Sequence, residues 1–369
     1  MRFVTLIACL APSFLDAQVQ VEALPEPGIQ PQVVMAPGGL VHVVYLKGDP
    51  KGCDIRHSSR NVSGGAWSTP VTVNSASRSA IAAGTIRGAQ IALGKDGCLQ
   101  VVWNGSTIAE ATKRGKAPLF HARLVPGARE FTQQQDLLGE TTALDGGASI
   151  TANENGHVAV VWHASPAGTS GEQDRLVWVR YSADNGGSFS PAEPLNKVQA
   201  GVCACCSLRA HLDSDDNLTV IYRAAPSPEE RGMHLITSKS GRSTLRKLDD
   251  WKVRMCPMSS ASLLPEAAGV RGAWENQGKI TTALINQQSP HFVTLEARDA
   301  KHPVLSQNHR GQILISCVIG SGWSKAGRLH WELLEGNGTK VGVGDGEKLP
   351  VWSYAAAYAR PDGTFVILK

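Results

Sequence analysis

A pair of apolar segments joined by a short turn recurs along the chain. One copy spans residues 33–45 around a Pro-Gly-Gly turn, and a second spans residues 90–103 around a Lys-Asp-Gly turn. Alternating or continuous β-branched residues that flank a turn tolerant of positive φ are typical of a β-hairpin. Further copies span residues 149–162, 209–222, 262–274, 304–318 and 357–368. The pattern therefore predicts seven hairpins.

Two weaker strands follow the hairpins, for example at Asp54–Ser58 and Val71–Asn74 after the first, and at Leu176–Ser182 and Glu193–Lys197 after the third. A unit of four strands (A to D) that repeats every ~45–60 residues is typical of a propeller blade. We expect an all-β single propeller with seven blades, or six blades and an extra hairpin. The last unit lacks a third strand, and we expect Val19 to Leu24 to supply its outer strand and close the ring.

Composition agrees with such a fold and narrows the partners. The 369 residues are 42% hydrophobic and 18% charged, with 38 glycines and 20 prolines for turns. The net charge is only +4, and no basic run carries interleaved aromatics, so we expect no nucleic-acid partner. No break in composition marks a linker, so residues 18–369 are expected to form one domain, which we expect to be a monomer.

The first 17 residues resemble an export signal. Arg2 precedes a mostly apolar stretch, and Asp16-Ala17 offers a cleavage point before Gln18. No segment is apolar over the length needed to span a bilayer. We therefore expect a secreted or periplasmic protein, with a lipid anchor at Cys9 as the alternative.

One predicted C–D turn carries a specific motif, Ser182-x-Asp184-x-Gly186-x-x-Phe189. Its Ser and Asp can satisfy turn amides, and its Gly can supply positive φ. With this motif the sequence resembles the Asp-box (BNR-repeat) sialidase-like propellers. Residues 79–90, 103–106, 202–206 and 251–259 resemble an uncharacterised branch of exported bacterial sialidase-like proteins. The motif itself indicates fold and not function.

The resemblance also defines what a catalytic site would need. Retaining sialidases use three arginines, a tyrosine activated by glutamate, and an aspartic acid. Their Arg-Ile-Pro marker is missing, because Val34-Met35-Ala36-Pro37 stands in its place. The sequence therefore does not establish an activity. If the protein is an enzyme, the resemblance implies a sialidase-like glycoside hydrolase, with Glu275 and Asp145 as the catalytic candidates.

Candidate ligand-binding residues fall on the B–C and D–A connections, which leave the blades at one end and crowd the mouth of the channel. They are Arg87, Asn104, His163, Arg223, Arg254, Trp323 and Trp352. Each has a structural alternative: ion pairs between blades for the arginines, a hydrogen-bonded rim position for His163, and edge packing for the tryptophans. Glu275 can equally brace a loop.

Four cysteines cluster in the sequence, at Cys203, Cys205, Cys206 and Cys256. Two disulfides, a soft-metal site for Cu or Zn, and free redox thiols are the three interpretations. Adjacent cysteines rarely bond to each other, so Cys206–Cys256 or Cys205–Cys256 is favoured over Cys205–Cys206. Apart from such a metal, we expect no cofactor.

Three functional hypotheses follow. The first is an exported sialidase-like propeller that binds an anionic or sugar-like ligand, such as a glycan, at the channel mouth. The second is a glycoside hydrolase that uses Glu275 or Asp145, with Arg87 and Arg223 holding a carboxylate. The third is a non-catalytic interaction scaffold or a soft-metal-binding propeller.

Overall fold

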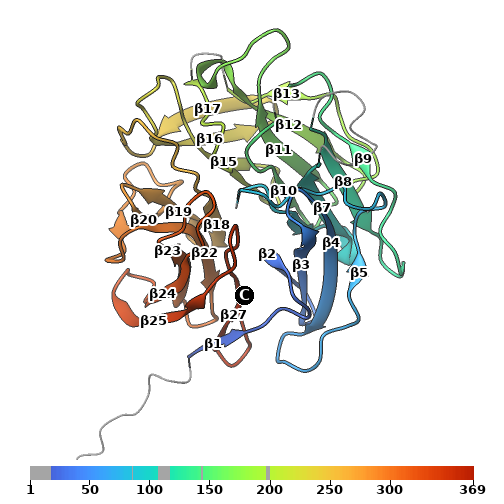
Figure 1. The fold of residues 1–369 in the computed structure, drawn as a ribbon, viewed down its shortest axis with the longest axis vertical. Helices are drawn as coiled ribbons and strands as arrows, with labels where there is room; N and C mark the ends of the chain where they lie inside the picture. Colours follow the sequence, from blue (N-terminus) through green and yellow to red (C-terminus); the bar gives the residue numbers. More distant parts are fainter. Residues whose placement is uncertain (1–17, 85, 107–116, 143, 197–199) are drawn as a thin grey trace, which may run out of the picture.

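Seven sheets surround a common axis in the computed structural model (Figure 1), which describes residues 18–84, 86–106, 117–142, 144–196 and 200–369. The predicted leader, residues 1–17 with Cys9, lies outside the described residues. The prediction of an all-β propeller with seven blades is confirmed, and the six-blade alternative is wrong.

The first six blades are four-stranded antiparallel sheets, each built from consecutive strands. Blades one to three contain β2 (Ile29–Ala36), β3 (Leu40–Asp49), β4 (Gly52–Asn61) and β5 (Val71–Thr72); β6 (Gln90–Leu93), β7 (Leu99–Asn104), β8 (Leu119–Leu124) and β9 (Gln135–Asp136); and β10 (Ser149–Ala152), β11 (Val158–Ala164), β12 (Leu176–Ser182) and β13 (Glu193–Pro194). Blades four to six contain β14 (Arg209–Leu212), β15 (Leu218–Arg223), β16 (Met233–Lys239) and β17 (Arg242–Lys247); β18 (Ala261–Glu266), β19 (Gly269–Asn276), β20 (Lys279–Leu284) and β21 (Val293–Thr294); and β22 (Ala300–Gln307), β23 (Ile313–Ile319), β24 (Arg328–Leu334) and β25 (Lys340–Lys348).

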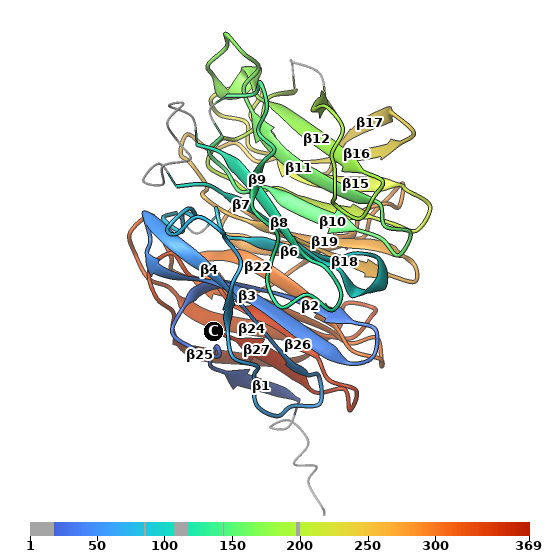
Figure 2. The same ribbon diagram turned by 90° about the vertical axis from the view of Figure 1, so that its right-hand side faces the viewer.

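The two ends of the chain close the ring in blade seven. This blade contains β26 (Ala356–Ala359), β27 (Phe365–Leu368) and the N-terminal strand β1 (Val19–Glu22), which pairs in parallel with β27. Figure 2 shows β1 beside β27 and β26. The first strand of every blade contacts the first strands of both neighbours, so the seven strands β2, β6, β10, β14, β18, β22 and β26 line the axis. The predicted closing strand is confirmed.

Burial explains the continuous apolar runs in the second strands. All seven residues of β11 are buried, because each inner sheet is covered on both faces by its neighbours. One core cluster, for example, joins Val161 and Val179 of blade three to Val220 and Ile236 of blade four. The packing between blades therefore forms the core.

The turn Ser182–Phe189 is stabilised by its own side chains. Asp184 accepts hydrogen bonds from Ser188 N and Ser188 Oγ at 2.9 and 2.7 Å, and Ser182 Oγ accepts one from Gly186 N at 2.9 Å. Gly186 has a φ of +79°, which favours glycine. The ring of Phe189 packs edge-on against His121. This turn lies at the end of the blades opposite to the B–C and D–A connections, beside the A–B turn of blade two.

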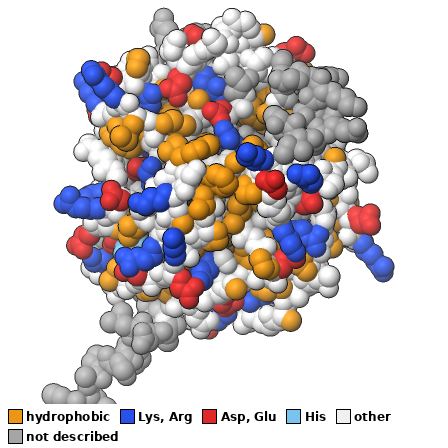
Figure 3. Space-filling model, in the orientation of Figure 1, with side chains coloured by type: hydrophobic (Ala, Val, Ile, Leu, Met, Phe, Trp, Pro, Cys, Tyr) orange, Lys and Arg blue, Asp and Glu red, His pale blue; other side chains and the backbone are white. Residues whose placement is uncertain are grey.

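The surface is mixed in character. Hydrophobic side chains gather near the centre of the face seen in Figure 1, bordered by basic and acidic ones (Figure 3). Within the described residues, none of the helical segments has the length and apolar character needed to cross a membrane.

Candidate functional site

A cavity of about 210 Å³ lies at the channel mouth, at the end of the blades where the D–A connections converge. Segments from five blade junctions and one B–C loop line it, and they lie far apart in the sequence. The described lining residues are Gly84, Ile86, Arg87, Asp145, Cys205, Cys256, Met258, Lys301, His302, Ser321, Gly322 and Trp323. The predicted convergence of the D–A loops at one end is thus observed.

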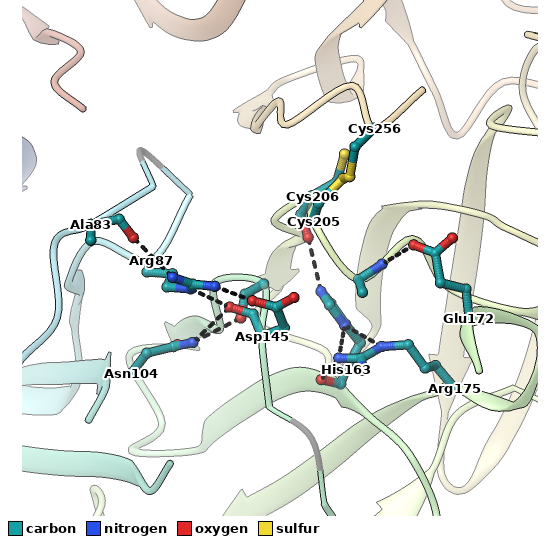
Figure 4. Close-up of polar contacts among 12 residues, drawn as sticks. Ala83, Arg87, Asn104, Asp145, His163, Glu172, Arg175, Cys205, Cys206 and Cys256 are labelled. Atoms are coloured by element: carbon teal, nitrogen blue, oxygen red, sulfur yellow. Dashed lines mark hydrogen bonds and ion pairs between the residues drawn. A yellow bond between two sulfur atoms is a disulfide. The ribbon is translucent and has the colours of Figure 1, made fainter. Parts of the chain in front are cut away.

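Arg87 and Asp145 form one wall of the cavity. The Arg87 guanidinium forms an ion pair with the Asp145 carboxylate, and its Nε donates to the Asp145 carbonyl at 2.9 Å. Its Nη1 also donates to the Ala83 carbonyl at 3.0 Å (Figure 4). The Asp145 side chain stays 40% exposed. The Arg87–Asp145 ion pair therefore joins the D–A connections that lead into blades two and three, and both of its charged groups still line the cavity.

A β-bulge places two further groups on the wall. The register of β22 against β23 shifts between Lys301 and Val304, and His302 has a φ of +56°. Bulges re-aim side chains at the rims of closed sheets. Burial, followed by the nearby charges of Lys301 and Arg209, lowers the pKa of His302 to about 3, so this imidazole is neutral at pH 7. Of these two residues, only Lys301 therefore contributes a positive charge to the cavity wall, and its Nζ donates to the Pro257 carbonyl.

Two tryptophans stand at the third side. Trp323 is 50% exposed and lines the cavity. Trp352 packs against it edge-on, with ring centroids 6.5 Å apart, and its indole N–H donates to the Trp323 carbonyl. Trp352 is not among the lining residues, so it supports Trp323 from behind.

Four other candidates occupy one equivalent position in successive blades. Asn104, His163, Arg223 and Glu275 each follow the buried aromatic residue near the end of the second strand. All four are at most 3% exposed, and none lines the cavity. The structure therefore separates them from Arg87, Asp145 and Trp323, although all of them lie at the same end of the blades.

Asn104 and His163 connect their blades to the next D–A loop. Asn104 Nδ2 donates to the carbonyls of Asp145 and Gly146 at 3.2 and 3.0 Å. Arg175 donates to Nδ1 of His163, so the proton sits on Nε2, which donates to the Cys206 carbonyl at 2.8 Å (Figure 4). Burial and the Arg175 charge lower the pKa of His163 to about 3. These residues brace adjacent blades.

Arg223 and Glu275 continue this series. Arg223 donates to the carbonyls of Arg231 and Glu275 at 2.7 and 2.6 Å, and its guanidinium lies over the Trp251 ring. Burial raises the pKa of the Glu275 carboxyl, although the charges of Lys301 and Arg223 oppose this effect. Its Oε2 has no hydrogen-bond partner among the described residues. Glu275 thus lies behind the cavity wall.

The three candidate arginines do not meet at the cavity. Arg87 lines it, Arg223 is buried, and the Arg254 side chain is 85% exposed and ion-paired with Glu229. A retaining sialidase would also need an activated tyrosine. The phenol of Tyr354 is buried and accepts a hydrogen bond from Gln32, and burial raises its pKa, whereas a tyrosine nucleophile needs a lowered pKa. Among the described lining residues, Asp145 is the sole carboxylate.

The cysteine cluster contains one disulfide, Cys205–Cys256, which is one of the two favoured pairings. The prediction of a second disulfide is wrong, because Cys203 and Cys206 are buried thiols, 3.6 Å apart at Sγ. The sulfurs of Cys203, Cys205 and Cys256 lie within 4.8 Å of one another. A metal would need them as thiolates, so this sulfur set fits Cu(I) or Zn only after the disulfide is reduced.

Sequence reasoning missed Lys301 and His302, which line the cavity. A signal was present, because both residues lie at the start of β22, directly after the D–A connection that leads into blade six. The D–A connections into blades two, three, four, five and seven had each supplied a candidate. The bulge that turns them toward the cavity depends on strand register, which the residue pattern does not reveal.

Comparison with known proteins identifies the fold. No known family model matches the sequence, and no curated protein matches it. Among solved structures, an α-L-arabinanase from Penicillium chrysogenum complexed with arabinobiose is similar, with a TM-score of 0.57, 8% identity, and coverage of 88% of this chain and 98% of that one.

Two further structures give a similar result. A Dyadobacter fermentans protein of unknown function has a TM-score of 0.55 at 12% identity, covering 91% of this chain and 98% of that one. A Hadza microbial sialidase has a TM-score of 0.52 at 12% identity, covering 78% of this chain and 63% of that one. At these identities the likeness establishes a shared propeller fold and leaves the activity open.

Proposed function

We propose that this protein binds a small anionic, sugar-like ligand in the cavity at the channel mouth. The observation that carries the proposal is the lining itself: Arg87 and Lys301 contribute two positive charges against the single negative charge of Asp145. His302 adds no charge at pH 7, because its pKa is about 3. The net positive charge in a concave site favours an anion.

Trp323 supplies the second half of the argument. A half-exposed indole beside charged groups can pack on the apolar face of a sugar ring while the cations hold its carboxylate. Similar propellers include one named as an arabinanase and one named as a sialidase, which makes carbohydrate the first ligand class to test. Hydrolysis has less support, because it requires two carboxyl groups facing one pocket.

The test is calorimetric titration with N-acetylneuraminate and glucuronate, with glucose as the neutral counterpart, at low and high salt. We expect saturable binding of an acidic sugar that weakens as salt screens the cations. Lys301→Met should weaken this binding about tenfold, as expected for loss of a charge-assisted contact. Equal binding of neutral and acidic sugars, or no binding of any, would contradict the proposal.

Export is also part of the proposal. The disulfide Cys205–Cys256 suits an oxidising compartment, and residues 1–17 have the pattern of a cleaved leader. N-terminal sequencing of the protein recovered from a bacterial periplasm or medium should begin at Gln18. A mature chain that still begins at Met1 inside the cytoplasm would contradict this part.

A further inference from the structure

Four sulfurs meet at the cavity wall, in two chemical states. Cys205 and Cys256 form a disulfide that lines the cavity, and Cys256 is exposed. Behind them, the buried thiol of Cys203 has its Sγ 3.3 Å from Cys205 Sγ and 3.6 Å from Cys206 Sγ. A thiol in contact with a disulfide sulfur is placed for exchange.

We propose that this cluster is a thiol–disulfide exchange site, in which the disulfide moves between Cys205–Cys256 at the cavity wall and Cys203–Cys206 behind it. The buried pair has the C-x-x-C spacing typical of redox-active dithiols. Cys203 occupies the central place, because it contacts both Cys205 and Cys206.

The surroundings of Cys203 and Cys206 determine which of the two thiols loses its proton more easily. Burial by itself would raise the pKa of Cys206, but the hydrogen bond from Cys203 and the nearby Arg223 guanidinium outweigh burial and lower it. The same hydrogen bond, reinforced by burial, raises the pKa of Cys203. Cys206 is therefore the more acidic of the two groups, so at pH 8 its thiolate stands beside the Cys203 thiol and can accept the proton of that attacking group.

The exchange needs two balanced steps. In the first, Cys206 takes the proton of Cys203, the Cys203 sulfur bonds to Cys205, and the electron pair of the broken bond leaves on Cys256. In the second, the Cys206 sulfur bonds to Cys203, and its proton passes to the departing Cys205. One proton and one negative charge are kept throughout, so neither an oxidant nor a reductant is consumed. The exchanged state presents one thiol, Cys205, and one thiolate, Cys256, to the cavity.

The test traps the exchanged state. The native wild-type protein is incubated at pH 8 with iodoacetamide and no reductant, quenched in acid, and mapped by peptide mass spectrometry. We expect alkylated Cys256 and Cys205, together with a Cys203–Cys206 disulfide. Wild-type protein that keeps Cys205–Cys256 intact and unalkylated through a day of incubation would overturn the proposal, whatever the variants do.

Variants then resolve the two steps. Cys206→Ser should leave Cys205 unlabelled and slow the labelling of Cys256 about tenfold, because it removes the base and the second step. Cys203→Ser should abolish both labels. Cys317→Ser, which removes a buried thiol of blade six, is the matched control and should label like the wild type. Equal labelling of Cys256 in Cys203→Ser would show attack from another thiol and overturn the proposal.

Discussion

Two sets of residues at the same end of the propeller have opposite surroundings. The brace positions, Asn104, His163, Arg223 and Glu275, are buried at the ends of second strands. The cavity residues come mainly from D–A connections, as Arg87 and Asp145 do, from the start of β22, as Lys301 does, and from the B–C loop that carries Trp323. Polar residues beside a channel mouth therefore divide into a layer that joins blades and a layer that can meet a ligand.

The geometry of the repeat explains this division. The position after the buried aromatic lies near the end of the second strand, and the side chain there is buried in all four blades. A polar side chain there must find partners inside the protein, and Asn104, His163 and Arg223 find them in backbone carbonyls of the adjacent blade. Side chains on the D–A connections lie above this layer and are free to face the cavity.

The largest expected effect concerns a brace. Arg223→Met should lower the free energy of unfolding by about 2–4 kcal/mol, because it leaves the buried carbonyls of Arg231 and Glu275 without a donor. Lys301→Met, on the cavity, is the matched control and should cost only about 1 kcal/mol, because it removes a single hydrogen bond, to the Pro257 carbonyl. Chemical unfolding measures both. Equal losses in the two variants would remove the distinction between the layers.

The next effect concerns the cavity. Trp323→Ala should weaken binding of an acidic sugar about tenfold, through the loss of stacking on a half-exposed ring. Its unfolding free energy should change little, because Trp323 lies outside the core clusters. Titration calorimetry and chemical unfolding on the same preparation test both statements. A large loss of stability would instead place Trp323 with the braces.

A smaller effect appears in the pH dependence. The folded-state pKa of His163, about 3, lies below the unfolded value of about 6.5, so the unfolded chain binds the proton first as the pH falls. Stability contributed by the neutral ring is present above pH 6.5 and is lost progressively toward pH 3. When the pH falls from 6.5 to 5.5, the unfolding free energy of the wild type should therefore decrease by about 1 kcal/mol more than that of the His163→Gln variant.

Glutamine suits this test because its amide can donate to the Cys206 carbonyl and accept from Arg175. His291→Gln changes an exposed histidine and is the matched control, for which we expect the wild-type slope. If His163→Gln also keeps the wild-type slope, the imidazole is not held neutral by its neighbours.

The smallest effect concerns Arg254, which belongs to neither layer. Its side chain is 85% exposed and pairs with Glu229 at the surface. Exposed ion pairs contribute little, so Arg254→Ala should change both the unfolding free energy and the sugar affinity by less than about 0.5 kcal/mol. A tenfold loss of affinity would return Arg254 to the binding site.

The sequence predicted the fold well, because hairpin patterning is local. The seven units, the closing strand expected within Val19 to Leu24 and the crowding of D–A loops all follow from strand alternation and turn residues. Site membership was harder to predict. Arg87 and Arg223 look alike in sequence, and only the depth of packing separates them. Likewise, the strain of adjacent cysteines left both Cys206–Cys256 and Cys205–Cys256 open, and side-chain placement decides between them.

The most direct test of the account is a crystal structure of the protein bound to the acidic sugar that binds it most tightly. The account predicts a ligand at the channel mouth, with its ring on Trp323, its carboxylate near Lys301, and no contact with Asn104, His163 or Arg223. A ligand bound at the opposite end of the blades, beside the turn Ser182–Phe189, would contradict it.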